Sequence, residues 1–275
     1  MHNRRPARLA ILDMYDGTPN QGMRCIQEIV DRYKAALDWK VFDVRGKAEV
    51  PDLEYDIFIS TGGPGSPHDG DGVWDAKYYD WLDQVWHWNL NKKNDRKYVF
   101  FICHSFQMAV KYFKLAEIPL RKSMSFGTFR CHMTDQGVSE PCFDGLPNPF
   151  FVADFREWQV IQPKLERFDE LGAEILALEK IRPHVPLERA IMAIRFSKEM
   201  FGTQFHPEAD PEGMLQHFMD PERRKKVINE HSRDKYLRMI DHLNDSDKIG
   251  LTHDIVLPSF LERSIRALQQ EPVVA

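Results

Sequence analysis

The chain has 275 residues, a formal net charge of -5 and an isoelectric point near 6.1. Hydrophobic residues make up 43% and charged residues 29%, an ordinary composition for a globular protein. Neither nucleic acid nor an anionic membrane is expected as the main partner, because both select basic surfaces. No apolar run approaches the roughly 18 residues of a membrane span, and none near the N-terminus is long enough for a signal peptide. We therefore expect a cytoplasmic protein.

Apolar strands and helix-spaced apolar residues alternate through the first half of the chain. Strands are predicted at residues 9–12, 39–44, 55–60 and 98–102, and helices at residues 22–37, 76–91 and 104–113. Near-continuous apolar strands that alternate with helices predict an α/β fold whose parallel sheet is covered on both faces. Ligands bind beyond the carboxyl ends of the strands in such sheets. The segments T-G-G-P-G-S-P (61–67) and C-H-S-F-Q (103–107) both follow strand ends.

The second half changes character twice. Its first part predicts strands separated by turns, at residues 124–133, 150–155, 158–161, 175–178, 190–196 and 201–205. After Pro207, residues 211–243 and 256–270 are charged and helical in pattern. We therefore expect one domain over residues 1–210 and a helical C-terminal extension over 211–275 that packs on it. The charged run E-R-R-K-K (222–226) is interpreted as a solvated helix face rather than a partner contact.

The cysteines are scattered, without a C-x-x-C pair, at Cys25, Cys103, Cys131 and Cys142. Neither a zinc site nor a disulfide framework is expected, and no cofactor is indicated. The residues His68, Asp69 and Asp71 can be read as metal ligands, but Gly and Asp in P-H-D-G-D-G favour a polar turn. We therefore expect no metal.

Cys103 can be a packed core cysteine or a nucleophile. It lies between a predicted strand and a predicted helix, where a tight elbow would project its side chain. The N-terminus of that helix would stabilise a thiolate and lower the pKa of the thiol. The backbone N–H of His104 would then lie where it can donate to an oxyanion.

Two further segments complete a set of groups for acyl transfer. In F-G-T-Q-F-H-P-E (201–208), we expect a strand to end at His206, and Glu208 can orient the imidazole as in a triad. In the 61–67 loop, Gly62 and Gly63 let the backbone approach a ligand and offer a second oxyanion donor. Each segment alone has an ordinary structural explanation, but their joint placement at strand ends favours catalysis.

These segments resemble the class I glutamine amidotransferases. The resemblance covers roughly residues 8–210 and is carried by G-G-P-G-S, by Cys103 with Gln107 four residues later, and most specifically by Q-F-H-P-E. Stand-alone proteins similar to the amidotransferase domain of GMP synthase are the nearest in appearance. The resemblance implies a flavodoxin-like sheet and hydrolysis of glutamine to glutamate and ammonia through a γ-glutamyl thioester. Because no synthetase domain is expected after residue 210, the chain would act alone or with a separate ammonia-accepting synthetase.

The resemblance assigns a role to each residue of the set. Cys103 would be the nucleophile, His206 the base and Glu208 the residue that orients His206. The backbone N–H groups of Gly63, in the Gly62–Gly63 pair, and of His104 would form the oxyanion hole, and Gln107 would line the glutamine pocket.

The sequence departs from the family pattern at three places. Phe101 and Ser105 stand two residues before and after the cysteine, where the family has small residues, so a wider elbow or a displaced helix is expected. His104 replaces an apolar or aromatic residue, and its side chain is interpreted as a surface imidazole. The segment D-F-R-E-W-Q-V (154–160) replaces the S-H-G-D segment that helps synthetase-type members to dock a partner domain.

Two other functions are consistent with the same residues. A γ-glutamyl hydrolase or peptidase would use Cys103, His206 and Glu208 on another γ-glutamyl amide. A non-catalytic relative would keep these residues but lack a competent elbow, and Phe101 is the feature that points to it.

Overall fold

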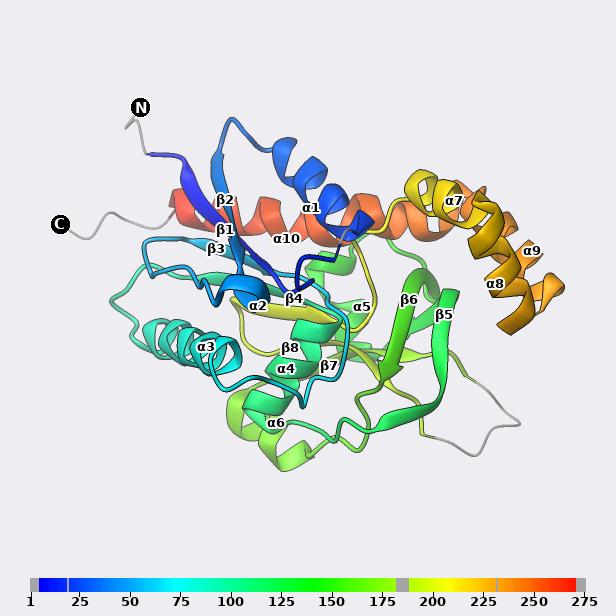
Figure 1. The fold of residues 1–275 in the computed structure, drawn as a ribbon. Coiled ribbons are helices and arrows are strands. Elements are labelled where there is room, and N and C mark those ends of the chain that lie inside the picture. Colours follow the sequence, from blue (N-terminus) through cyan, green and yellow to red (C-terminus); the bar gives the residue numbers. More distant parts are fainter. Residues whose placement is uncertain (1–4, 19, 182–187, 231, 271–275) are drawn as a thin grey trace.

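A computed structural model describes residues 5–18, 20–181, 188–230 and 232–270 of the chain, and within these ranges nine strands form one sheet. The strands are β1 (Ala7–Asp13), β2 (Leu37–Asp43), β3 (Ile57–Ser60), β4 (Tyr98–Ile102), β5 (Leu120–Met133), β6 (Phe150–Trp158), β7 (Glu174–Glu179), β8 (Ile191–Arg195) and β9 (Met200–Thr203). Their order across the sheet is β2-β1-β3-β4-β9-β8-β7-β5-β6 (Figure 1).

The sheet has a parallel half and an antiparallel half. Strands β2, β1, β3, β4 and β9 pair in parallel, and the pairs from β9 through β8, β7 and β5 to β6 are antiparallel. Helices cover both faces, so the predicted α/β, flavodoxin-like fold class is confirmed, as a mixed sheet. The helices are α1 (Gln21–Asp31), α2 (Val44–Lys47), α3 (Trp74–Leu90), α4 (His104–Phe113), α5 (Asp135–Val138), α6 (Leu165–Leu171), α7 (Pro211–Met219), α8 (Pro221–Glu230), α9 (Arg233–Leu243) and α10 (Leu251–Gln270), with the short turns η1 (Pro141–Phe143) and η2 (Ser246–Gly250).

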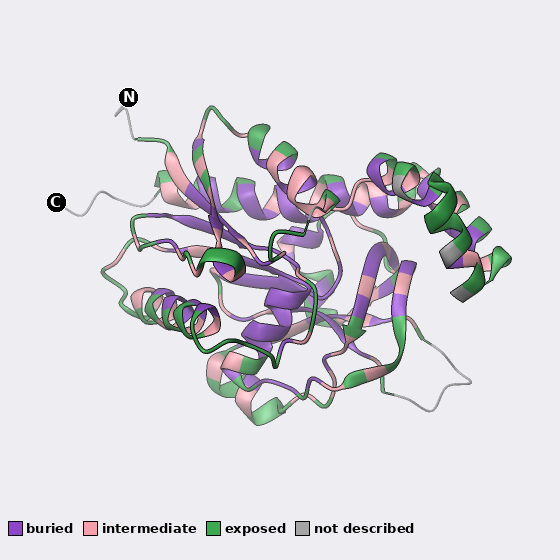
Figure 2. Cartoon of the chain, in the orientation of Figure 1, coloured by how far each residue is buried: buried purple, intermediate pink, exposed green. Residues whose placement is uncertain are grey.

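Alternate residues of the central strands enter two separate cores. Ala10 and Leu12 of β1 pack with α3 and α4 on one face, whereas Leu9 and Ile11 pack with α1 and α10 on the other. Side chains alternate between the faces of a strand, so a strand that is covered on both sides must be apolar throughout. Figure 2 shows the result, a continuously buried band along the strands and α4.

Several predicted boundaries were wrong. The predicted helix 22–37 ends at Asp31, because residues 32–36 form turns and Leu37 already begins β2. The two strands predicted at 150–155 and 158–161 are mainly one strand, β6, followed by an isolated bridge at Ile161. Strand β9, the last strand along the chain, ends at Thr203 rather than at His206. The short helices α2, α5 and α6 carry too few residues for a clear period in the sequence.

The C-terminal residues form two kinds of contact. Helices α7, α8 and α9, which replace the single run expected over 211–243, pack with β5 and β6 in a small third core. Pro221 begins α8, as is common for proline in the first turn of a helix. Helix α10 instead lies across the sheet beside α1, where Phe260 and Leu261 join the core (Figure 1). No helix in the described ranges combines the length and the apolar character that crossing a membrane requires.

Candidate active site

Cys103 occupies a strained turn between β4 and α4. Its backbone has φ 48° and ψ -96°, a left-handed conformation that is costly for a residue with a side chain. The Cys103 N–H donates to the Thr203 carbonyl at 2.8 Å, and the Cys103 carbonyl accepts from the Gln107 N–H at 3.0 Å. The turn is thus fixed by β9 on one side and by the first turn of α4 on the other. Strain of this kind persists where the surroundings over-determine it, as at many active sites.

The large Phe101 fits without widening the elbow. It lies opposite Gly202 of β9, and a Cβ atom on Gly202 would lie 3.2 Å from the Phe101 Cβ and 2.8 Å from Phe106 Cδ2. Because position 202 is a glycine, strand β9 leaves room beside Phe101 for its large side chain. Helix α4 still begins directly after Cys103. The wider elbow or displaced helix expected from Phe101 is wrong for this reason.

Ser105 stabilises the same turn through its hydroxyl. The Ser105 Oγ accepts from the Ile102 N–H at 2.9 Å and donates to the Ser60 carbonyl at 2.6 Å. These bonds tie the start of α4 to the ends of β4 and β3. The second departure from the family pattern thus adds two buried hydrogen bonds at the elbow.

His206 and Glu208 lie beside the cysteine. His206 Nδ1 and Glu208 Oε1 are 2.8 Å apart, and a Cβ atom on Gly62 would lie 2.8 Å from His206 Cε1 and 3.6 Å from the Cys103 Cβ. Burial alone would lower the pKa of His206, but the Glu208 carboxylate and Cys103 outweigh it and hold the pKa well above its ordinary value. The geometry therefore brings the predicted nucleophile, base and orienting carboxylate together.

Elements far along the chain hold this group. The His206 N–H donates to the Ala153 carbonyl at 2.9 Å, which joins the segment after β9 to β6. His253 of α10 lies with its Nδ1 2.9 Å from the Glu208 carbonyl oxygen. The Tyr15 hydroxyl is also close, since a Cβ atom on Gly62 would lie 3.3 Å from it. Burial, followed by the charges of Glu208 and Cys103, raises the pKa of Tyr15 well above its ordinary value.

Sequence reasoning did not identify Tyr15 or His253. Tyr15 precedes a turn, D-G-T-P-N, and His253 lies in a charged helical stretch, so neither has a local signal for a site. The one indication for Tyr15 is its position just beyond the carboxyl end of β1, at the same edge of the sheet as Cys103.

The two residues predicted to supply oxyanion donors border the cysteine cavity. Gly63 and His104 both line it, and within the described residues their N–H groups have no hydrogen-bond acceptor. A Cβ atom on Gly63 would lie 2.3 Å from the Met14 carbonyl oxygen, so only glycine allows the loop to pack this closely on the end of β1. The predicted oxyanion donors therefore lie on the same cavity as Cys103.

The His104 side chain is buried and not on the surface, so its interpretation as a surface imidazole was wrong. It is 2% exposed, and neither ring nitrogen has a partner among the described residues. Burial, followed by the charge of Arg45, lowers the pKa of His104 to about 3. The imidazole is therefore neutral at physiological pH.

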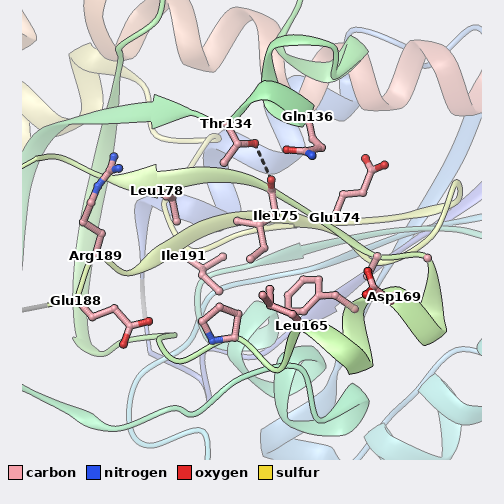
Figure 3. Close-up of a pocket in the computed structure, with 14 residues that line it drawn as sticks. Thr134, Gln136, Leu165, Asp169, Glu174, Ile175, Leu178, Glu188, Arg189 and Ile191 are labelled. Atoms are coloured by element: carbon pink, nitrogen blue, oxygen red, sulfur yellow. Dashed lines mark hydrogen bonds between the residues drawn. The ribbon is translucent and has the colours of Figure 1, made fainter.

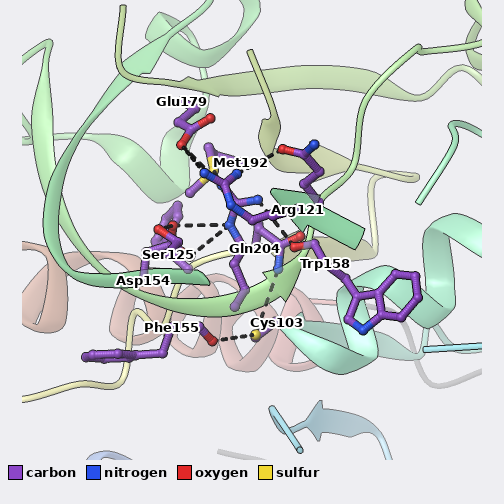
Figure 4. Close-up of polar contacts among 12 residues, drawn as sticks. Cys103, Arg121, Ser125, Asp154, Phe155, Trp158, Glu179, Met192 and Gln204 are labelled. Carbon is purple, nitrogen blue, oxygen red and sulfur yellow. Dashed lines mark hydrogen bonds and ion pairs between the residues drawn. The ribbon is translucent and has the colours of Figure 1, made fainter. Parts of the chain in front are cut away.

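Gln107 lies behind the cysteine with a second glutamine. Its Nε2 donates to Gln204 Oε1 at 3.1 Å, and Gln204 Nε2 lies 3.8 Å from the Cys103 Sγ. The Phe155 carbonyl lies 3.9 Å from the same sulfur, as Figure 4 shows. Gln107, Cys103 and Phe155 border a cavity of about 250 Å³, whose lining also includes Gly63, His104, Arg156, Glu157 and Trp158.

A larger hollow lies elsewhere. It measures about 780 Å³ between α6 and the β7–β8 pair, and Thr134, Leu178 and Ile191 are among the residues that line it (Figure 3). Neither Cys103 nor His206 borders it. Of the residues predicted for the site, Gly63, Cys103, His104 and Gln107 border the smaller cavity, and size alone indicates no reaction.

The other predicted features have structural roles. The remaining cysteines, Cys25, Cys131 and Cys142, are buried, and burial raises the pKa of each, that of Cys25 to about 12. In the 67–72 segment, Asp71 accepts from the N–H groups of Val73 and Trp74, as a turn-forming aspartate does. Within the described ranges, no three His, Cys, Asp or Glu side chains form a group that could hold a metal ion.

Comparisons with solved structures show the same fold. A glutamine amidotransferase from Thermotoga maritima is 16% identical, covers 95% of this chain and 99% of its own, and has a TM-score of 0.68. A glutamine amidotransferase from Methylobacillus flagellatus is 13% identical, with 98% of both chains covered and a TM-score of 0.63. A putative GMP synthase subunit from Thermoplasma acidophilum is 17% identical, with 98% and 100% covered and a TM-score of 0.55.

The sequence itself carries the family signature. No curated protein matches this chain. The family model for class-I glutamine amidotransferases matches residues 11–222, which include the elbow, the glycine loop and the His206–Glu208 segment. Members of this family generally act by hydrolysing glutamine. The chain therefore belongs to the class-I glutamine amidotransferase family.

Proposed function

We propose that this chain hydrolyses glutamine to glutamate and ammonia, with Cys103 as nucleophile, His206 as acid and base, and Glu208 as the group that orients His206. The observation that carries the proposal is the strained Cys103 elbow beside the 2.8 Å His206–Glu208 contact. A core cysteine needs neither a left-handed backbone nor a histidine fixed by a buried carboxylate. Acyl transfer by a cysteine needs a base that a third group orients, and a strained strand-to-helix turn is one way to present the nucleophile to it.

The proposed first half of the reaction forms a thioester. The Cys103 thiolate attacks the side-chain carbonyl carbon of glutamine, and the oxyanion that develops is bound by the N–H groups of Gly63 and His104. The His206 imidazolium donates a proton to the amide nitrogen as the C–N bond breaks and ammonia leaves. The γ-glutamyl group remains on Cys103.

Water completes the reaction. His206, neutral after the first half, takes a proton from the attacking water molecule, and the second tetrahedral intermediate collapses to glutamate and the Cys103 thiolate. The charge of Glu208 keeps the pKa of His206 high, so the imidazolium that forms at this step is stabilised. Both half-reactions thus use the same base and the same oxyanion donors.

The ammonia would pass to a separate acceptor enzyme. Family members pair with ammonia-accepting synthases, and we propose that this chain does too. The segment 154–160 does not present Asp154 or Arg156 for docking, because they are 1% and 3% exposed and bonded to each other. Glu157 is exposed at the cavity and is the residue of this segment that a partner can reach.

The proposal is tested with glutamine and a panel of other γ-glutamyl amides. The purified chain should release ammonia from glutamine, and mass spectrometry should detect a γ-glutamyl adduct on Cys103. Turnover of other γ-glutamyl amides but not of glutamine would favour a γ-glutamyl hydrolase instead. No turnover of any compound, together with no adduct, would leave only a non-catalytic relative.

Alkylation gives an independent measurement. Iodoacetamide should modify Cys103 faster than Cys25, Cys131 and Cys142 in the native protein, since the pKa of each of these three is raised by burial. Equal rates for all four thiols would contradict an activated Cys103. Cys25→Ala serves as the matched control, and its ammonia release should equal that of the unchanged chain.

A further inference from the structure

Glu208, the residue proposed to orient His206, lies in a turn and not in a strand or a helix. Strand β9 ends at Thr203 and helix α7 begins at Pro211, so the regular backbone bonding of neither element extends to Glu208. Within the described ranges, the Glu208 carbonyl oxygen accepts no backbone N–H, and its contact is with the side chain of His253, whose Nδ1 lies 2.9 Å away. The position of the orienting residue therefore depends on a side chain of α10.

Both ring nitrogens of His253 have a partner. Nδ1 faces the Glu208 carbonyl oxygen, and Nε2 lies 3.1 Å from Nη2 of Arg32, the residue that follows α1. A carbonyl oxygen can only accept a hydrogen bond, and a guanidinium group can only donate one. Both contacts are therefore satisfied when the proton is on Nδ1 and the lone pair is on Nε2, whereas the other neutral tautomer satisfies neither.

His253 has little freedom to turn away from Glu208. It is 7% exposed and lies in the first turn of α10, and Leu257 of the next turn is part of the core. Arg32 is also held by Asp254, whose Oδ1 lies 3.7 Å from Nη1. A ring that is buried and bonded through both nitrogens is fixed in place before a substrate arrives.

We propose that His253 is a positioning residue, which holds the Glu208 backbone so that the Glu208 carboxylate meets His206. The inference rests on the proposed function, because it gives His253 a role only through Glu208 and His206. A base needs a third group that orients it, and that group must itself be held in place. His253 does not border the cysteine cavity, so it acts through Glu208 and not on the substrate.

Ammonia release measured against glutamine concentration tests the proposal with two variants. His253→Leu removes the donor, and kcat should fall by about tenfold to 100-fold, since displacement of a catalytic group by about 1 Å can cost about 10²-fold. KM should stay within about twofold, because His253 does not border the cavity. His253→Asn keeps an N–H at the same number of bonds from the backbone as Nδ1, and it should restore kcat to within about threefold of the unchanged chain. An unchanged kcat in His253→Leu, or an equal loss in both variants, would overturn the proposal.

Thr252→Val is the matched control. Thr252 precedes His253, is 2% exposed and also donates from its side chain to a backbone carbonyl, that of Phe151 in β6, at 2.6 Å. Its replacement should lower the midpoint of urea unfolding but leave kcat within about twofold of the original, because the bond that is lost does not reach Glu208. An equal loss of kcat in Thr252→Val and His253→Leu would show that His253 only holds α10 in place.

Two NMR measurements separate this inference from glutamine hydrolysis. Nitrogen NMR of the histidine rings in the unchanged chain should show His253 protonated on Nδ1, and the opposite tautomer would overturn the proposal even if no variant folded. The pKa of His206 should fall in His253→Leu, because the Glu208 carboxylate that raises it is displaced, and should stay unchanged in His253→Asn. A pKa of His206 that does not move in His253→Leu would also overturn the proposal. An unchanged chain that releases no ammonia would contradict the proposed function, whereas the two NMR results would still decide whether His253 positions Glu208.

Discussion

Two clusters of buried polar side chains lie close together but differ in how many of their polar atoms have a hydrogen-bond or ion-pair partner. Behind the cysteine cavity, a network of charged side chains joins β5, β6 and β7 (Figure 4). Beside the cavity, Cys103, His206 and Glu208 form the proposed catalytic group. The network is fully satisfied, and the catalytic group is not.

The network holds every charge with a partner. Arg156 Nε contacts both Asp154 oxygens at 3.0 and 3.1 Å, and its Nη2 lies 3.6 Å from Glu179 Oε1. Arg121 reaches the same Glu179 oxygen at 3.2 Å, and the Ser125 hydroxyl donates to Asp154 at 2.6 Å. No buried side-chain nitrogen or oxygen of these five residues lacks a partner in the described structure.

The catalytic group leaves atoms available. Glu208 Oε2 of this group is buried without a partner among the described residues, and so are both ring nitrogens of the neighbouring His104. Unpaired buried polar atoms cost about 1–3 kcal/mol each, so they persist where something other than stability retains them. The comparison teaches that the network is satisfied by its own side chains, whereas the proposed catalytic group keeps a buried carboxylate oxygen, Glu208 Oε2, without a partner among the described residues.

Removal of the nucleophile should give the largest difference between the two clusters. Cys103→Ser should lower the rate of ammonia release by about 10⁴-fold or more, because a serine hydroxyl is not activated by this base as a thiol is. Its midpoint of urea unfolding should stay near that of the unchanged chain, since the two side chains are similar in size. Residual activity above a thousandth of the original would argue against Cys103 as nucleophile.

Glu208→Gln should have the next largest effect. The rate should fall by about 10³-fold, because the imidazole loses the charge that orients it and stabilises its protonated form. The pKa of His206, followed by NMR of its ring protons, should fall. A raised pKa in the folded chain stabilises it below the ordinary value near 6.5, and this contribution is lost as pH rises through the raised pKa. Glu208→Gln should therefore lose stability mainly at low and neutral pH.

Asp210→Asn is the matched control for Glu208→Gln. Asp210 lies two residues further on and pairs with Arg24 at 2.9 Å, outside the catalytic group. Its replacement should leave the pKa of His206 and the rate within a few-fold of the original. An equal loss of rate in both variants would mean that Glu208 acts only through local structure.

Asp154→Asn should have the opposite effects, a large loss of stability and a small loss of rate. It removes the charge of the nearer of the two carboxylates that pair with Arg156, and breaking a buried pair in this way costs about 3 kcal/mol of unfolding free energy. Urea unfolding should show this loss, whereas the rate of ammonia release per folded molecule should change much less than in Glu208→Gln. A rate that falls by more than about 100-fold, with stability unchanged, would place the network in the catalytic machinery.

The sequence predicted the parallel half of the sheet better than the antiparallel half. Strands β1, β3 and β4 are buried on both faces, so their apolar runs are continuous and easily recognised. Strands β5 and β6 carry the network, and charges such as Arg156 within a strand hide its burial. Because these charged residues interrupt the apolar pattern, the sequence predicted two strands where the structure has mainly β6.

The residues proposed to react could be singled out in the sequence because they lie at or just beyond strand ends, and the residues that hold them could not. His253 contacts Glu208 from 45 positions away, and Gly202 accommodates Phe101 from a strand that is adjacent only in the fold. Such contacts depend on the order of the strands, which no local pattern in the sequence contains. The buried His104 was missed for the same reason, since Arg45 and the glycine loop cover it.

Replacement of His104 should give the smallest effect and separates its backbone from its side chain. His104→Leu keeps the N–H that we assign to the oxyanion hole, so the rate should stay within about tenfold of the original. It removes two unpaired ring nitrogens, so unfolding free energy at neutral pH should rise by about 1 kcal/mol.

The pH dependence of stability tests the same side chain. The pKa of His104 is about 3 in the folded chain, so below the ordinary histidine pKa near 6.5 the unfolded chain binds a proton on this imidazole and the folded chain does not. The unchanged chain should therefore lose stability as pH falls from about 7 to 4, and the advantage of His104→Leu in urea unfolding should grow over that range. A constant difference between the two chains at all pH values would show that the imidazole binds its proton equally well in the folded and unfolded chains, against a lowered pKa in the fold.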